Sequence, residues 1–206
     1  MDHNSHSIGI YNRIADIWVE HYNGVSQEVS HFVESLAKDV LIIDLGCGAG
    51  ANTHHIFNKG YAVIGIDLSD NLLTHAKEHY PGVLFRRDDA RTFTCDPAGA
   101  IIIHYCYVSM PKKEIEQSLQ QVLTNLQPGG KLFLAHQEGE SKEIPDEPFF
   151  PEHIGDDSAM FLSIYTKDEM VETLVSAGFV IDDVIVREPK GKEITRGKIY
   201  VTAHKA

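Results

Sequence analysis

The sequence has few cysteines, few basic residues and no long apolar run. Its three cysteines, Cys47, Cys95 and Cys106, lie far apart, and none belongs to a Cys-x-x-Cys pair. This spacing argues against a disulfide framework and a zinc site, and it favours a reducing cytoplasm, where we expect the protein to be located. The N-terminal residues lack the pattern of a secretory signal, and no apolar run approaches the roughly 18–20 residues of a membrane span, so we expect no membrane partner.

Basic residues are outnumbered, because 18 Lys and Arg stand against 30 Asp and Glu and give a formal net charge of −12. Proteins that act on nucleic acids gather basic residues where the phosphates lie, and no such cluster is visible here, so we expect no nucleic-acid partner. Twelve histidines raise the question of a metal site. His75 and His79 lie four residues apart on a predicted helix, but we expect that face to be solvated and predict no metal.

The length of 206 residues, with 43% apolar and 23% charged residues, predicts a single globular domain over residues 1–206, monomeric or homodimeric. Residues 1–38 should form an N-terminal helical cap with amphipathic helices at 8–23 and 25–37. From residue 40 onward strands and helices alternate, which is typical of an α/β sheet with helices on both faces. We predict strands at 40–45, 61–66, 83–85, 100–104, 131–135, 179–186 and 198–203, and helices at 50–59, 70–79, 111–126 and 167–177.

Residues 137–160 interrupt this alternation with a segment rich in proline, glycine and acidic residues. An insertion of this length in a compact domain is usually either functional or disordered. Phe149, Phe150, His153, Met160 and Phe161 give it more apolar and aromatic character than a linker needs. We therefore interpret it as a lid over the substrate, with a disordered surface loop as the alternative.

Three glycines, Gly46, Gly48 and Gly50, lie between the first predicted strand and its helix. Glycines allow the backbone to approach a ligand closely, but this spacing also satisfies the G-x-G-x-x-G/A fingerprint of dinucleotide-binding oxidoreductases. Asp67, which is 21 residues after Gly46, ends the second strand and would accept hydrogen bonds from ribose hydroxyls in either case. These features predict a nucleoside-type ligand at the carboxyl ends of the strands.

Asp44 separates the two interpretations. A carboxylate at this point would repel a pyrophosphate at the helix N-terminus, whereas it would attract a sulfonium and an ammonium group. Such a ligand is S-adenosylmethionine (SAM).

At this point the chain resembles the class I SAM-dependent methyltransferases of the small-molecule type. The similarity rests on several segments in the expected order, namely IIDLGCGAG at 42–50, GIDLS at 65–69, RDDAR at 87–91 and LQPGGKL at 126–132. Residues 11–15 resemble the N-terminal helix of these enzymes, and residues 167–179 resemble their late helix. One segment departs from the pattern, because the fourth strand begins with Ala98-Gly99-Ala100 in place of Phe-Asp.

The resemblance implies a single Rossmann-like doubly wound sheet, mostly parallel with an antiparallel C-terminal strand and preceded by N-terminal helices. It also implies SAM as cofactor, S-adenosylhomocysteine as product, and no metal. By the same resemblance Leu68 packs on adenine, Asp89 accepts from the adenine amino group, and the amide of Ala90 binds the ring. The predicted cofactor-binding residues are Tyr11, Asp44, Gly46, Cys47, Gly48, Gly50, Asp67, Leu68, Asp89 and Ala90.

The methyl acceptor is predicted only as a small molecule, with the acidic insertion favouring a cationic or neutral one. Some acceptors need a general base, and His104, His136 and His153 are the candidates. We predict His104 and Tyr105, after the fourth strand, as catalytic, and Tyr107 could also line the pocket. A catalytically silent SAM-binding module and a nucleotide-cofactor oxidoreductase remain alternatives.

Overall fold

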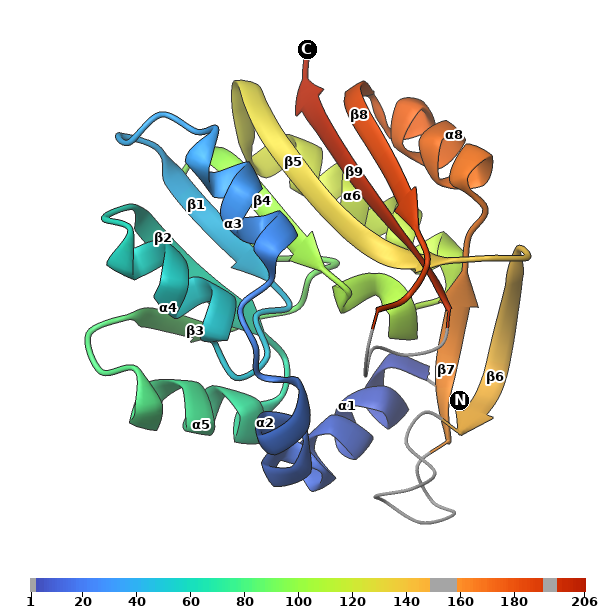
Figure 1. Cartoon of the computed structure of the whole chain (residues 1–206), viewed down its shortest axis with the longest axis horizontal. Coiled ribbons are helices and arrows are strands. Elements are labelled where there is room, and N and C mark those ends of the chain that lie inside the picture. Colours follow the sequence, from blue (N-terminus) through green and yellow to red (C-terminus); the bar gives the residue numbers. More distant parts are fainter. Residues whose placement is uncertain (1–2, 149–158, 191–195) are drawn as a thin grey trace.

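The sheet of this protein, seen in a computed structural model that describes residues 3–148, 159–190 and 196–206, has seven strands in the order β3-β2-β1-β4-β5-β9-β8 (Figure 1). Neighbouring strands from β3 to β5 run parallel, and β9 runs antiparallel to both β5 and β8. This confirms the predicted doubly wound sheet with an antiparallel C-terminal strand. The strands are β1 (Leu41–Leu45), β2 (Ala62–Asp67), β3 (Leu84–Arg87), β4 (Ala98–His104), β5 (Leu126–Glu138), β8 (Phe179–Arg187) and β9 (Gly197–Lys205).

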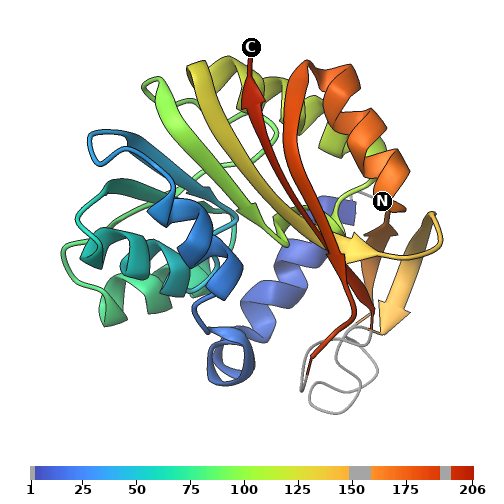
Figure 2. The ribbon, with the colours of Figure 1, turned by 45° about the horizontal axis from the view of Figure 1, so that its top comes forward.

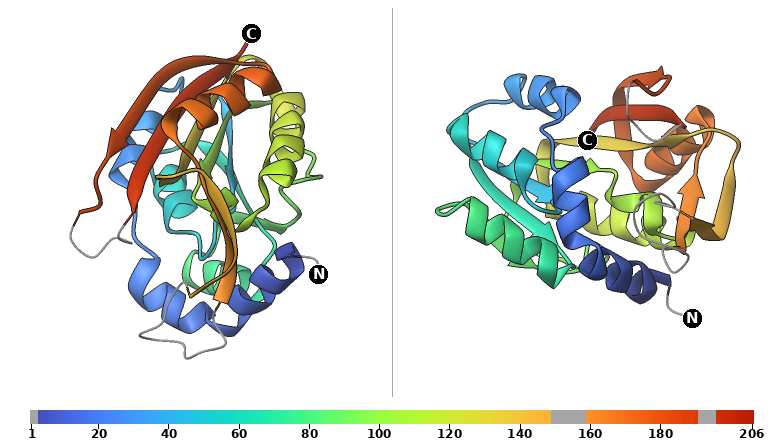
Figure 3. Two further views of the ribbon diagram at one scale, coloured as in Figure 1. Left: turned by 90° about the vertical axis from the view of Figure 1, so that its right-hand side faces the viewer. Right: turned by 60° about the horizontal axis from the view of Figure 1, so that its bottom comes forward.

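Helices cover both faces of the sheet, as the views in Figure 3 show. The crossover helices are α4 (Ala51–Asn58), α5 (Asp70–His79) and α6 (Lys112–Asn125), with α8 (Lys167–Ala177) before β8 and a 3₁₀ turn, η1 (Cys106–Ser109), after β4. Alternate residues of β4 enter different cores, because Ile102 packs with α3 (Gln27–Glu34) and α4, whereas Ile101 packs with α6 and α8. A strand buried on both faces in this way reads as a continuous apolar run.

The N-terminal cap consists of α1 (His3–Arg13), α2 (Ala15–Tyr22) and α3. The prediction of one continuous helix over 8–23 is wrong, because the chain leaves helical geometry at Ile14. The two halves pack against different neighbours: Ile10 and Ile14 contact Met160, whereas Ala15 packs near Leu72. Figures 1 and 2 show α1 and α2 below the carboxyl ends of the central strands.

The described part of the insertion is a β-hairpin and not a loop. β5 continues to Glu138, and β6 (Lys142–Pro148) pairs antiparallel with β7 (Ala159–Ile164). Residues 160–164 of β7 are all buried, so they add a satellite core beside the sheet. The segment is therefore not an irregular loop in its described part, whereas its role as a lid over the substrate stays a prediction. Phe149, Phe150 and His153 lie outside the described residues. In the ranges given above, no helix is both long and apolar enough to cross a membrane.

Candidate functional site

A cavity of about 700 Å³ opens at the carboxyl ends of the central strands, between the sheet and the N-terminal helices. Three aromatic residues of α1 and α2, namely Tyr11, Trp18 and Tyr22, lie on its helical side. Most of the predicted site residues meet here. Those that line the cavity are Tyr11, Gly46, Gly48, Asp67, Leu68, Ala90, His104 and Tyr105, whereas Asp44, Cys47, Gly50 and Asp89 are not among the lining residues.

The loop at residues 46–50 between β1 and α4, called here the glycine loop, holds its shape by close packing. Gly46 has a φ of +76°, and a Cβ there would lie 2.3 Å from the Cβ of Cys106 in the segment after β4. Gly50 has a φ of +87°, and its Cβ would lie 2.7 Å from the ring of Phe85. Only glycine fits both requirements, positive φ and no side chain. Gly50 therefore packs the start of α4 onto the sheet and does not contact the cavity.

Asp67 links the glycine loop to β2. Its Oδ2 accepts a hydrogen bond of 2.8 Å from the amide of Gly48, and its Oδ1 accepts one of 2.8 Å from the amide of Ser69. Burial raises the pKa of Asp67 above its ordinary value, and these amides oppose that rise. Each carboxylate oxygen can accept a second hydrogen bond. Asp67 can therefore bind ligand hydroxyls without losing its contacts with the loop.

Asp44 lies behind the loop, fully buried, and its Oδ2 accepts a hydrogen bond of 2.6 Å from the hydroxyl of Thr53 on α4. Burial raises its pKa from 3.8 to about 6, and the neighbouring charge of Asp67 adds to the rise. The predicted cofactor contact is corrected on this point, because Asp44 can act on the cavity by its charge but not by touching a ligand. Cys47 is likewise a packing residue, and burial raises the pKa of its thiol.

The two acids after β3 differ in their position relative to the cavity. Both carboxylate oxygens of Asp89 accept hydrogen bonds from the Arg91 side chain, at distances of 2.6–3.1 Å, and Arg91 also binds Glu114 at 2.9 Å. Asp88 lines the cavity in its place, beside Ala90. Asp89 is thus engaged by Arg91 and does not line the cavity, whereas Asp88 does and is itself paired with Arg86 at 3.2 Å.

His104 and Tyr105 lie at the end of β4 and line the cavity together. Their rings meet edge to face at 4.7 Å between centroids, and the Tyr105 hydroxyl is 3.0 Å from that of Tyr200. Tyr105 has a φ of +59°, and it is the one non-glycine residue with positive φ in the described part of the chain. A bulky residue in this conformation costs roughly 1–2 kcal/mol. Such strain is commonly found where a side chain must point into a site.

His136 does not reach the cavity. It is fully buried, its Nδ1–H donates to the carbonyl of Gln137 at 3.1 Å, and its Nε2 lies 3.4 Å from the Ser163 hydroxyl. Burial lowers its pKa to about 4. The candidacy of His136 as a base is therefore wrong, as is the pocket position of Tyr107, whose hydroxyl is buried against Ser118 at 2.7 Å. The third candidate, His153, lies outside the described residues.

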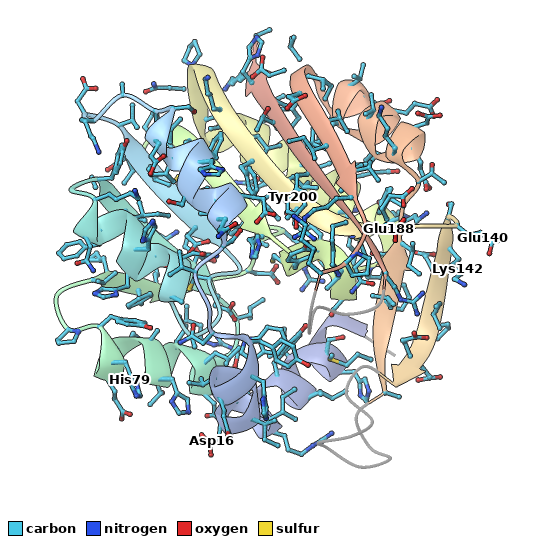
Figure 4. All side chains as sticks on the ribbon, in the orientation of Figure 1. Asp16, His79, Glu140, Lys142, Glu188 and Tyr200 are labelled. Carbon is cyan, nitrogen blue, oxygen red and sulfur yellow. The ribbon has the colours of Figure 1, made fainter. Side chains whose placement is uncertain are left out.

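The histidine pair of α5 lies on the outer surface, away from the cavity. His75 binds the carboxylate of Asp16 at 2.7 Å, and Figure 4 shows Asp16 and His79 at the periphery of the molecule. Among the residues that the structure describes, no group of three possible metal ligands occurs.

Comparison with known proteins shows a similarity to methyltransferases over part of the chain. Residues 42–130, which run from β1 through the glycine loop to the start of β5, match the family described as a methyltransferase domain. This part of the chain is therefore similar to methyltransferase domains. The chain is 32% identical over 126 residues to an uncharacterized methyltransferase of Oceanobacillus iheyensis, a match that covers 60% of this chain and 57% of that protein.

Solved methyltransferases share the fold over nearly the whole chain. A SAM-dependent methyltransferase of Methanosarcina mazei has a TM-score of 0.74 at 21% identity, covering 88% of this chain and 98% of that one. The 1,6-didemethyltoxoflavin-N1-methyltransferase of Burkholderia thailandensis, solved with 1,6-didemethyltoxoflavin and S-adenosylhomocysteine, has a TM-score of 0.77 at 16% identity, covering 100% and 90%. At these identities the likeness concerns the fold.

Several residues that line the cavity carry no motif and were not predicted from the sequence. They come from the N-terminal helices and from the last strands of the sheet: Trp18, His21, Tyr22, Glu28, Gln137, Arg187, Lys190, Lys198 and Tyr200. Arg187 joins the two groups, because its guanidinium binds Glu28 at 3.1 Å and the Tyr200 hydroxyl at 2.8 Å. Only the packing of the N-terminal helices against the last strands brings these residues together, so local sequence patterns hold no signal for them.

Proposed function

We propose that this protein is a SAM-dependent methyltransferase that acts on a small-molecule acceptor. One observation carries the proposal: a single cavity connects the glycine loop and Asp67 with the ends of β4 and β5. Its volume of about 700 Å³ lies within the roughly 300–1,000 Å³ of small-molecule sites. The end at the glycine loop and Asp67 suits a nucleoside cofactor, and the end at β4 and β5 leaves room for another molecule beside it.

The residues present fit the cofactor. A Cβ at Gly48 would point toward the indole Nε1 of Trp18 at 3.7 Å, so the missing side chain leaves space at the cavity wall. Asp67 would accept from the ribose hydroxyls, Leu68 would pack on adenine, and Asp88 would accept from its amino group. The family match and the SAM- or S-adenosylhomocysteine-bound methyltransferases of the same fold support this assignment.

SAM supplies an activated methyl group on a sulfonium when it is bound. The protein's task is then to align the acceptor with the methyl group and to exclude water. Tyr11, whose hydroxyl lies 3.4 Å from that of Ser109, and Tyr105 would shape the space around the reacting atoms. His104 would take the proton of a hydroxyl acceptor, because it is the histidine at the end of β4 that lines this part of the cavity.

Calorimetry with SAM, S-adenosylhomocysteine and NAD tests the cofactor assignment. We expect both sulfur compounds to bind and NAD not to bind, since the charge of Asp44 behind the loop opposes a pyrophosphate. Asp67→Ala should weaken SAM binding tenfold or more, which is on the order of 1.4 kcal/mol. Asp16→Ala, on the outer surface, is the matched control and should leave the affinity unchanged.

Two results would contradict the proposal. Binding of NAD without any response to SAM would indicate a nucleotide-cofactor enzyme. An unchanged dissociation constant for SAM in Asp67→Ala would show that Asp67 does not bind the ribose. Mass spectrometry of a metabolite extract incubated with protein and SAM tests the catalytic part. Tight SAM binding without any methylated product would favour a catalytically silent module.

A further inference from the structure

The carboxylate of Asp67 is held by two backbone amides, and the N-terminal cap contacts both of the residues that supply them. These residues are Gly48 in the glycine loop and Ser69 at the start of α5. The indole of Trp18 on α2 lies beside Gly48, since a Cβ there would be 3.7 Å from the indole Nε1. The side chain of Asn12, near the end of α1, contacts Ser69. The cap therefore lies against both supports of Asp67.

The hydroxyl of Ser69 is engaged on both sides. It donates a hydrogen bond of 2.7 Å to the Oδ1 of Asn12, and its Oγ accepts one of 3.2 Å from the amide of Leu72, which caps α5. A serine hydroxyl has a single hydrogen, and Asn12 receives it. Ser69 is only 2% exposed, so the loss of this acceptor would leave a buried donor without its partner, which is costly. Asn12 therefore fixes the side-chain conformation of Ser69.

Asn12 is itself held by a reciprocal contact with Asn71 in the first turn of α5. Its Oδ1 also accepts a hydrogen bond of 3.1 Å from the amide of Asn71, and its backbone carbonyl accepts one of 2.7 Å from the Asn71 side chain. Asn12 precedes the last residue of α1, and the chain leaves helical geometry two residues later at Ile14. The junction of α1 and α2 is therefore fixed to the first turn of α5.

Tyr11, the neighbour of Asn12, belongs to the cavity. It lines the cavity, and its hydroxyl lies 3.4 Å from that of Ser109 in the segment after β4. Burial raises the pKa of Tyr11 to about 12, and the charge of Asp67 adds to the rise. The last turn of α1 thus contributes one residue to the cavity wall and the next residue to the support of Asp67.

We propose that Asn12 is a positioning residue for the cofactor site. It fixes the hydroxyl of Ser69, and through the Ser69 amide it holds the Asp67 carboxylate in the orientation that accepts the ribose hydroxyls. Hydrogen bonds weaken steeply when they are misaligned, so a binding carboxylate needs such support from behind. The inference rests on the proposed function and extends it, because it makes the N-terminal cap part of the cofactor site.

Calorimetry with two ligands tests the proposal, namely S-adenosylhomocysteine and its analogue without ribose hydroxyls, S-(2′,3′-dideoxyadenosyl)homocysteine. Asn12→Ala should weaken the binding of S-adenosylhomocysteine about threefold to tenfold, the range expected for one hydrogen bond to a buried group. The same variant should bind the dideoxy analogue as tightly as wild type does, because this ligand makes no use of the Asp67 carboxylate. A merely loosened structure would weaken both ligands by the same factor.

Further variants separate the action through Ser69 from a general loosening of the cap. Asn12→Asp keeps the acceptor for the Ser69 hydroxyl and should bind both ligands like wild type. Ser69→Ala removes the hydroxyl but keeps the amide, so it should reproduce the selective loss even if Asn12→Ala impairs folding. In Asp67→Ala, the additional change Asn12→Ala should have no further effect, because both residues act along one chain of hydrogen bonds.

Asn71→Ala is the matched control. It removes the exposed bond to the Asn12 carbonyl, which holds the same turn of α1 to α5, and it leaves the contact between Asn12 and Ser69 in place. This variant should keep the wild-type ratio of the two affinities. Thermal denaturation of every variant would show that the proteins compared are folded.

Four results would overturn the inference. These are an equal loss of both ligands in Asn12→Ala, an unchanged affinity for S-adenosylhomocysteine in both Asn12→Ala and Ser69→Ala, a loss in Asn12→Asp as large as in Asn12→Ala, and a selective loss of the same size in Asn71→Ala. Failure of the wild-type protein to bind S-adenosylhomocysteine would instead contradict the proposed function.

Discussion

Replacing Asp44 with asparagine should stabilise the protein at neutral pH. Each pKa unit corresponds to about 1.36 kcal/mol, so the rise of the Asp44 pKa from 3.8 to about 6 means that its buried charge costs the folded state about 3 kcal/mol. An amide removes the charge and can still form hydrogen bonds with Thr53, since its oxygen accepts and its nitrogen donates. We expect Asp44→Asn to raise the free energy of unfolding by about 1–3 kcal/mol at pH 7.5.

The pH dependence distinguishes this explanation from a general packing effect. Because the folded pKa lies above the unfolded one, the wild-type protein regains this stability as the pH falls from about 6 toward 3.8. The difference between wild type and variant should therefore be full above pH 6 and absent near pH 4. Urea denaturation at several pH values measures it, with Asp39→Asn on the exposed surface before β1 as control.

Two outcomes would refute this reasoning. One is a variant that is less stable than wild type at pH 7.5, and the other is a difference that stays the same at pH 7.5 and pH 4. The same variant should lose part of its preference for SAM over S-adenosylhomocysteine, because the charge behind the loop favours the sulfonium cation. Calorimetry with both compounds would show this loss.

Three further predictions concern packing and the site. Gly50→Ala should lower the free energy of unfolding by about 2 kcal/mol or more, because the added methyl group meets the ring of Phe85. Gly60→Ala, also at positive φ but with open space around it, should lower that free energy by only the roughly 1 kcal/mol of backbone strain. Equal losses of the two variants in thermal denaturation would contradict the steric argument. Asp88→Ala should weaken S-adenosylhomocysteine binding in calorimetry, whereas Asp89→Ala should lower stability and leave the affinity unchanged; the reverse pattern would restore Asp89 to the site. His104→Gln should lower kcat for a hydroxyl acceptor about 100-fold without changing SAM affinity, and an unchanged kcat would exclude it as the base.

Much of the fold follows from local signals. The helices at 70–79 and 167–177 have the predicted bounds because their ends are set by neighbouring residues. Ser69 accepts a hydrogen bond from the amide of Leu72, and Gly178 ends α8 in the left-handed conformation. The glycine-loop end of the cavity was predictable for a similar reason, since its residues follow β1, β2 and β3 within a few positions.

The opposite end of the cavity depends on contacts between distant segments. Arg187 binds Glu28 across 159 residues of sequence, and its place on the wall follows from the register of β8 with β9. Which of the two consecutive acids lines the cavity was also beyond local inference, because both are ion-paired, Asp88 with Arg86 and Asp89 with Arg91, and only the three-dimensional structure shows that Asp88 lines it. The strands of the insertion were not predicted, because its prolines and acidic residues are typical of a loop. Its β7 is nevertheless buried at every position after Ala159.

The position of Trp18 has a practical consequence. It is the only tryptophan in the chain, it lines the cavity, and it sits between the rings of Tyr11 and Tyr22 at centroid distances of 5.3 and 5.0 Å. Light at the red edge of aromatic absorption, where tryptophan absorbs and tyrosine does not, would therefore excite a single reporter at the wall of the site. Its emission would change as a ligand replaces water beside the indole. The unlabelled protein thus carries its own optical sensor of occupancy, suited to stopped-flow measurement of how fast the cavity fills and empties.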